Sequence, residues 1–171
     1  MARRRQVDEI EFDPQKDVGE VLAAMDRLAG AHDGWINLLP GVPEDAVEQP
    51  SQGVFSALFG TAQPPVSMCT WMPGRRGTDG GPGPKENWRT GETVGIMHPR
   101  GRFAVSQLAS LGVPVPTGWT VRQDHARRGL IVIPAPGRPH RAVLDWSIAA
   151  GEALSMVPLT GLWKARVYLP R

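Results

Sequence analysis

The sequence predicts an α+β fold whose second half, from about residue 92 to residue 169, forms a ferredoxin-like βαββαβ sheet. Apolar residues there recur at strand spacing and at helical spacing, in the order strand, helix, strand, strand, helix, strand. Leu130-Ile-Val-Ile133 is apolar at every position, as in a strand buried on both faces. Residues 119–124 and 162–169 alternate apolar and polar residues, as edge strands do. We therefore expect the sheet order fourth, first, third, second strand.

Turn residues delimit the helices of this half. Gly112 is expected to end the first helix, and Pro139 to begin the second, whose apolar stripe includes Val143 and Trp146. The predicted strands are residues 92–97, 119–124, 130–134 and 162–169, and the predicted helices are residues 102–111 and the segment from Pro139 to Leu154.

The first half begins with a helix signal at Asp13-Pro14, because aspartate caps a first turn and proline suits the first helical position. An apolar stripe then continues to Ala29, which predicts a helix from Pro14 to Ala29. We expect this helix to cover the face of the sheet that the other two helices leave open. Two short strands should extend or flank the sheet, at residues 35–39 and 66–72, and a short helix or turn is expected at residues 52–59.

Length and composition predict a single domain over residues 1–171. The chain has 171 residues, of which 41% are hydrophobic and 21% charged, the balance of an ordinary folded protein. The stretch 73–91 is rich in glycine and proline and is expected to be a mobile loop. No apolar run approaches the ~20 residues that span a bilayer. Acidic residues, not an apolar run, follow Arg3–Arg5, so we expect no secretion signal and a cytoplasmic location.

Several kinds of chemistry find no support in the sequence. Cys69 is the only cysteine, which excludes an internal disulfide and a cysteine-based zinc site. The formal net charge of +2 is too small to drive nucleic-acid binding by itself. The P-loop, nucleophile-elbow and zinc-protease motifs are all missing, so neither a cofactor nor a metal is predicted.

The predicted topology gathers polar residues at one edge of the sheet. The ends of its first two strands and the beginnings of its last two meet there, together with the start of the first helix. The candidate proton carriers at this edge are His98 and His125, with Asp124 to orient them. The candidate ligands for a phosphate or carboxylate are Arg100, Arg102, Arg127 and Arg128.

The same edge has an alternative interpretation as a solvated hairpin turn. Asp124 would then bond its own turn backbone, and His98 would end a strand before Pro99. Strand alternation places both imidazoles toward the helices and Asp124 on the other side, which argues against a direct pair of Asp124 with His125.

Trp88 lies in the polar stretch from Glu86 to Arg89 and is a candidate interaction residue. Tryptophan beside arginine in an exposed loop is typical of an interface anchor. Alternatively, Trp88 docks the loop back on the fold.

The segment from Leu111 to Trp119, followed by Gln123-Asp-His125 and Arg127-Arg-Gly-Leu130, resembles an actinobacterial protein family of no assigned activity. Trp35 to Pro40 and Leu159 to Trp163 fit the same resemblance. The resemblance implies a cytoplasmic protein and transfers no functional residue.

Three functions remain open from the sequence. The leading hypothesis is a non-enzymatic binding domain, with residues 98–102 and 124–128 as its surface for a protein partner or a small anion. The alternative is a small enzyme that acts on an anionic metabolite through His98 or His125. The third is nucleic-acid binding through Arg3–Arg5 and the arginine loops. The sequence names no substrate, partner or oligomeric state.

Overall fold

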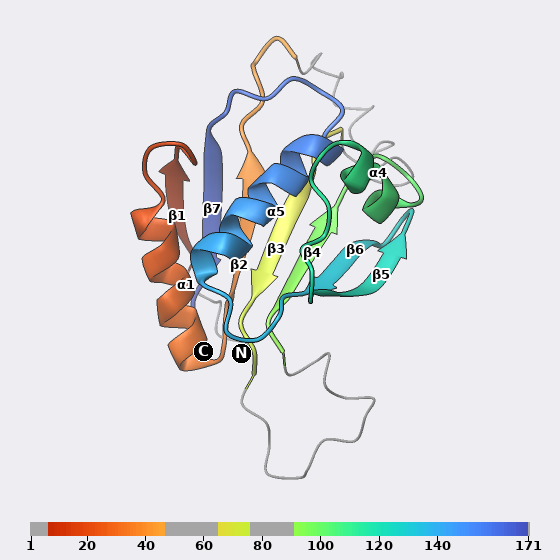
Figure 1. The fold of residues 1–171 in the computed structure, drawn as a ribbon. Helices are drawn as coiled ribbons and strands as arrows, with labels where there is room; N and C mark the ends of the chain where they lie inside the picture. The colour runs from red at the N-terminus through yellow and green to blue at the C-terminus, as the bar shows by residue number, and fades with distance from the viewer. Residues whose placement is uncertain (1–6, 47–64, 76–90, 171) are drawn as a thin grey trace, which may run out of the picture.

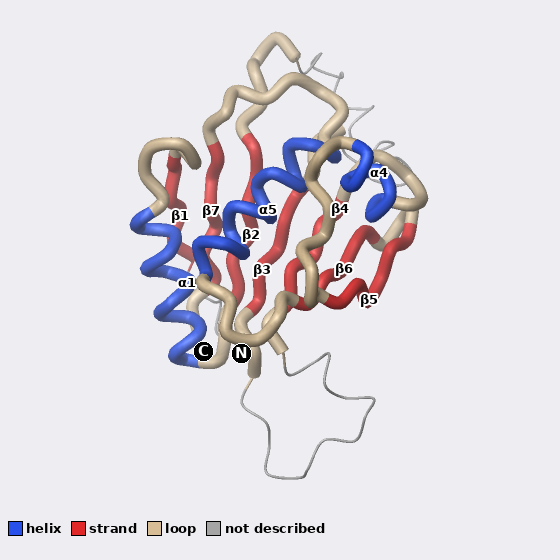
Figure 2. Tube along the Cα trace, viewed as in Figure 1, coloured by secondary structure: helices blue, strands red, loops and turns tan. Residues whose placement is uncertain are grey.

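The computed structural model describes residues 7–46, 65–75 and 91–170. These form a mixed α+β fold, as predicted, in which a seven-stranded sheet carries three helices (Figures 1 and 2). The strands are β1 (Val7–Phe12), β2 (Trp35–Pro40), β3 (Met68–Met72), β4 (Thr93–Met97), β5 (Thr120–His125), β6 (Gly129–Ile133) and β7 (Trp163–Tyr168). The helices are α1 (Gly19–Ala31), α4 (Ala104–Ser110) and α5 (His140–Leu154).

The sheet is antiparallel throughout, with the order β1-β7-β2-β3-β4-β6-β5. The adjacent strands β4, β6 and β5 follow the predicted order. The ferredoxin-like order is nevertheless not the one observed, because β7 pairs with β1 and β2 instead of β4. Strands β2 and β3 lie between β7 and β4. Because two strands are inserted between them, β7 still runs antiparallel to β4, as the prediction required. The alternating sequence of β7 fits beside β2 as well as it would beside β4.

Strand β1 was not predicted. It pairs with β7 over its whole length, from Val7 opposite Tyr168 to Phe12 opposite Trp163. Aspartate and glutamate have low strand propensity. The acidic residues of β1 therefore hid its alternation of more buried and more exposed positions from the sequence analysis. In the sheet Glu9 is opposite Arg166, whose Nε donates to its carboxylate at 2.8 Å. Cross-strand charge pairing therefore stabilises a strand that local propensity does not.

Helix α1 begins later than predicted, and it lies on a different face. Asp13 starts a separate turn, in which its carbonyl accepts hydrogen bonds from the backbone N–H groups of Lys16 and Asp17. The helix then begins at Gly19. It packs beside α5 on the same face of the sheet, so the prediction that it covers the opposite face is wrong (Figure 1). The apolar side of α1 is buried there. An apolar stripe predicts which side of a helix is buried, but not which face of the sheet the helix covers.

Helix α5 crosses the centre of the sheet and contacts α1, α4 and the central strands. A Cβ atom on Gly151 would lie 2.9 Å from the ring of Trp163 and 3.0 Å from Sγ of Cys69. Glycine thus permits the close approach of this helix to the sheet. The thiol of Cys69 donates to the carbonyl of Ser147, and burial raises its pKa to about 12, so it is inert at neutral pH.

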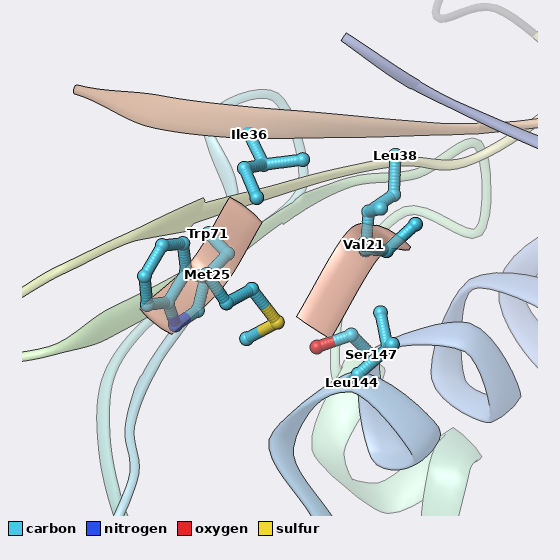
Figure 3. Close-up of a pocket in the computed structure, with 7 residues that line it drawn as sticks. All are labelled: Val21, Met25, Ile36, Leu38, Trp71, Leu144 and Ser147. Atoms are coloured by element: carbon cyan, nitrogen blue, oxygen red, sulfur yellow. The ribbon is translucent and has the colours of Figure 1, made fainter. Parts of the chain in front are cut away.

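The seam between α1, α5 and the sheet is well packed. Figure 3 shows Met25 of α1, Leu144 of α5 and Ile36 of β2 among the residues that line one small gap. The remaining gap has no room for a water molecule. This seam is therefore part of the core and not a ligand site.

The opposite face of the sheet carries no helix in the part of the chain that the structure describes (Figure 2). Ile131 and Ile133 of β6 are consequently half-buried, and the prediction of a strand fully buried on both faces is wrong. On the same face the rings of Trp35 and Tyr168 stack at 4.6 Å, and Thr70 donates to Asn37 at 3.0 Å. These contacts between neighbouring strands shield part of the apolar surface. Residues 52–59 and most of the predicted glycine loop lie outside the described ranges.

We predict that Gly129→Ala destabilises the protein far more than Gly101→Ala. Both glycines have a positive φ, of 77° and 76°, so each substitution costs about 1–2 kcal/mol of backbone strain. A Cβ atom on Gly129 would also collide with the carbonyl oxygen of Ile96, whereas one on Gly101 meets no atom within 4 Å. The clash should add about 1–3 kcal/mol. Urea unfolding of the two variants measures the difference, and equal losses would contradict it.

Candidate functional site

Residues from two parts of the chain meet at one end of the sheet, where α4 lies against β5 (Figure 1). The two carboxylate oxygens of Asp124 accept hydrogen bonds from the backbone N–H groups of Ala104 and Val105, at 3.0 and 3.1 Å. Strand β4 pairs with β6, and β5 leads into β6 through the turn at residues 126–128. We call residues 98–104 and 124–128 the rim. It contains the histidines, the aspartate and the arginines that the sequence singled out.

Asp124 caps α4 from a distant strand. The residue before α4 is Phe103, which has no side-chain oxygen with which to satisfy the first N–H groups of the helix. Strand alternation predicted Asp124 on the face away from the helices, and this prediction is wrong. A register irregularity between Val121 and Gln123 reverses the alternation and turns Asp124 toward α4.

His98 is completely buried. Its two ring nitrogens have no hydrogen-bond partner among the described residues. Burial lowers the pKa of His98, and the nearby charge of Asp124 opposes that shift only in part. The ring is therefore neutral near pH 7 and has no exposed surface through which to contact a substrate.

His125 stabilises the turn between β5 and β6. Its Nδ1 accepts hydrogen bonds from the backbone N–H groups of Arg127 and Arg128, at 3.1 and 3.2 Å. This nitrogen must therefore be unprotonated in the structure, since a protonated nitrogen cannot accept a bond. One imidazole is thus buried in the core, and the other is bonded to its own turn.

The four predicted arginines divide into two groups. The guanidinium of Arg100 donates to the carbonyl oxygens of Ala153 and Ser155, at 3.3 and 3.2 Å, and so satisfies the end of α5. Arg102, Arg127 and Arg128 are exposed on the rim. These three remain candidates for an anionic ligand, whereas Arg100 has a structural role.

Phe103 is a further residue of the rim whose position the sequence did not predict. It falls within the predicted helix 102–111, yet α4 begins only at Ala104 and Phe103 is 70% exposed. Its backbone has φ 64° and ψ 42°, the left-handed conformation that bulky residues rarely adopt. The carbonyls of Arg100 and Arg102 accept hydrogen bonds from Nε2 of Gln107, which hold the loop in place. No turn residue such as glycine or asparagine marks this position in the sequence as left-handed.

Two further observations limit the chemistry of the described residues. They contain no group of three histidine, cysteine or carboxylate side chains that would hold a metal ion. They also contain no helix with the length and hydropathy needed to cross a bilayer.

Trp88 and Arg3–Arg5, which the sequence proposed for interactions, lie outside the described ranges.

We predict that acid destabilises the protein partly through His98. Because the folded pKa is lowered, the unfolded chain binds the proton more tightly. The free energy of unfolding should therefore fall as the pH drops below the unfolded-state value of about 6.5, by up to about 1.4 kcal/mol per pH unit. His98→Leu should remove this part of the pH dependence. Urea unfolding at several pH values between 5 and 8 tests the prediction, which identical slopes for wild type and variant would contradict.

We also predict that Asp124→Ala lowers the free energy of unfolding by about 1–2 kcal/mol, because α4 loses its cap. Amide hydrogens of Ala104 and Val105 should exchange faster. Asp145→Ala is the control, since that carboxylate pairs with Arg141 on an exposed helix face and contributes about 0.5 kcal/mol. Equal losses in the two variants would mean that Asp124 does not cap the helix.

Comparisons of the chain with protein-family models, with curated proteins and with solved structures found no match. The rim and the open face of the sheet are therefore interpreted from their own geometry and chemistry.

Proposed function

We propose that this chain is a binding domain that docks an acidic protein segment on its rim, with Phe103 as the apolar anchor. The observation that carries the proposal is the 70% exposure of Phe103 in a left-handed backbone conformation. Arg102, Arg127 and Arg128 would surround the anchor with positive charge.

The conformation of Phe103 is costly without an evident structural benefit. A bulky residue in the left-handed region loses roughly 1–2 kcal/mol, and its exposed ring gains little from burial. Strain of this kind persists where the surroundings impose it, and it is concentrated at functional sites. Here Gln107 and Asp124 impose it from either side. The loop is thus already ordered, and a partner would lose less entropy on binding to it.

The charges of the rim favour an acidic partner. An exposed guanidinium binds a carboxylate through two parallel hydrogen bonds, which a lysine does not match. An aromatic anchor within a charged border is also the usual arrangement of an interface hot spot. We favour a peptide over a nucleic acid because the net charge of +2 is small and the carboxylate of Asp124 lies on the same rim.

An enzymatic role has less support from the same residues. General acid–base catalysis needs an imidazole within hydrogen-bond reach of a substrate. His98 is buried, and Nδ1 of His125 is occupied by its turn. A binding role needs neither ring and uses only the exposed side chains.

We predict that Phe103→Gly abolishes binding while raising the free energy of unfolding by about 1 kcal/mol, because glycine adopts a positive φ without strain. Phe103→Ala should also lose binding but should gain no stability, since alanine keeps the strain. Selection from a random peptide-display library, with the wild type as bait and Phe103→Gly for counter-selection, measures binding. Urea unfolding measures stability.

The expected outcome is a set of selected peptides rich in aspartate and glutamate around an apolar residue. Arg127→Gln and Arg128→Gln should weaken the binding of these peptides. Arg141→Gln, on the exposed face of α5, should leave their binding unchanged. Selected peptides that bind Phe103→Gly equally well would overturn the proposal. So would a salt-sensitive affinity for single-stranded oligonucleotides that depends on Phe103, which would indicate nucleic acid as the ligand.

A further inference from the structure

A groove of about 630 Å³ lies at the other edge of the sheet, where β1, β7 and β2 run side by side (Figure 1). Its volume falls within the range of roughly 300–1,000 Å³ typical of small-molecule sites. Its lining includes Glu11, Leu39, Thr160, Leu162, Lys164 and Arg166. The rim lies at the opposite edge, around β5, so the two sites share no residue.

One wall of the groove is fixed by backbone hydrogen bonds. The N–H group of Gly41 donates to the carbonyl of Leu162 at 2.7 Å, and the N–H group of Thr160 donates to the carbonyl of Gly41 at 2.9 Å. A Cβ atom on Gly41 would collide with Oγ1 of Thr160. The wall therefore has little freedom to collapse into the groove.

Two cations project from successive outward positions of β7. Arg166 donates from Nε to Glu9 at 2.8 Å, and Nζ of Lys164 lies 3.4 Å from Glu9 and 3.5 Å from Glu11. The side chains of Arg166 and Lys164 are 45% and 37% exposed. Exposed ion pairs of this kind contribute only about 0–1 kcal/mol, so another carboxylate can replace Glu9 at small cost. The terminal amino groups of Arg166 supply the paired donors that a carboxylate accepts.

The rest of the groove is apolar on one side and acidic on the other. Leu39 is half-buried, and the side chain of Leu162 is 56% exposed, which is high for leucine. Glu11 and Asp13 lie on the acidic side. These carboxylates would repel a doubly charged anion such as phosphate more strongly than a single carboxylate, whose apolar body can also lie on the two leucines.

We propose that this groove binds a small amphiphilic carboxylate. Its carboxylate would take the place of Glu9 on Arg166 and Lys164, and its apolar body would lie on Leu39 and Leu162. This site is independent of the proposed peptide-binding rim.

Isothermal titration with octanoate tests the proposal, with octylammonium and inorganic phosphate as comparison ligands. Arg166→Gln should weaken octanoate binding about tenfold, because it removes the paired donors. Glu9→Gln should instead strengthen binding several-fold, because it removes the competing carboxylate. Arg141→Gln is the matched control, since it also loses an arginine–carboxylate pair but lies outside the groove, and it should bind octanoate as the wild type does.

Three results would overturn the inference. The first is the absence of saturable octanoate binding at millimolar concentration. The second is equal octanoate affinity in the wild type and Arg166→Gln. The third is tighter binding of octylammonium or phosphate than of octanoate. None of these results bears on peptide binding at the rim, because the two sites share no residue.

Discussion

The close packing of α5 on the sheet positions much of the remaining structure. Gly151 allows the helix to approach Trp163 and Cys69 more closely than any larger residue would permit. Just beyond it, Ser155 accepts from the backbone N–H of Ser67 before β3, and its carbonyl accepts from Arg100 after β4. One helix end thus connects a central strand of the sheet to the loop that carries Phe103. The packing of α5 in the core is therefore physically linked to the position of the loop that carries Phe103.

Within residues 7–46, 65–75 and 91–170, the helices bury one face of the sheet, and no helix covers the other. Edge strands of such a sheet tend to pair with other chains, and this molecule limits that tendency in two ways. Strand β1 presents acidic residues such as Glu9, and β5 carries a register irregularity and the exposed Arg122. The open face itself is partly shielded by the stacked rings of Trp35 and Tyr168. The acidic residues at the β1 edge also give the groove an acidic side beside its apolar side.

Two unfavourable features lie at the rim. Phe103 has a strained backbone and an exposed ring, and His98 is buried with both nitrogens unpaired among the described residues. Each lowers the stability of the fold, and they lie only a few residues apart in the chain. Cooperatively folded proteins tend to break local rules where function requires it. The exposed and strained Phe103 directs the functional interpretation to the rim.

The sequence by itself determined the type of nearly every described element, because periodicity reports which side of a strand or helix is buried. It also brought His98, Asp124 and the arginines to one region, since β4, β5 and β6 are close in the chain and pair as predicted. Tertiary structure decided the rest. The place of β7 depends on hydrogen bonds between strands distant in sequence, which no pattern in β7 encodes. The conformation of Phe103 was likewise decided by tertiary structure, because the N–H groups that follow it are capped by Asp124 of β5 and not by a neighbouring side chain.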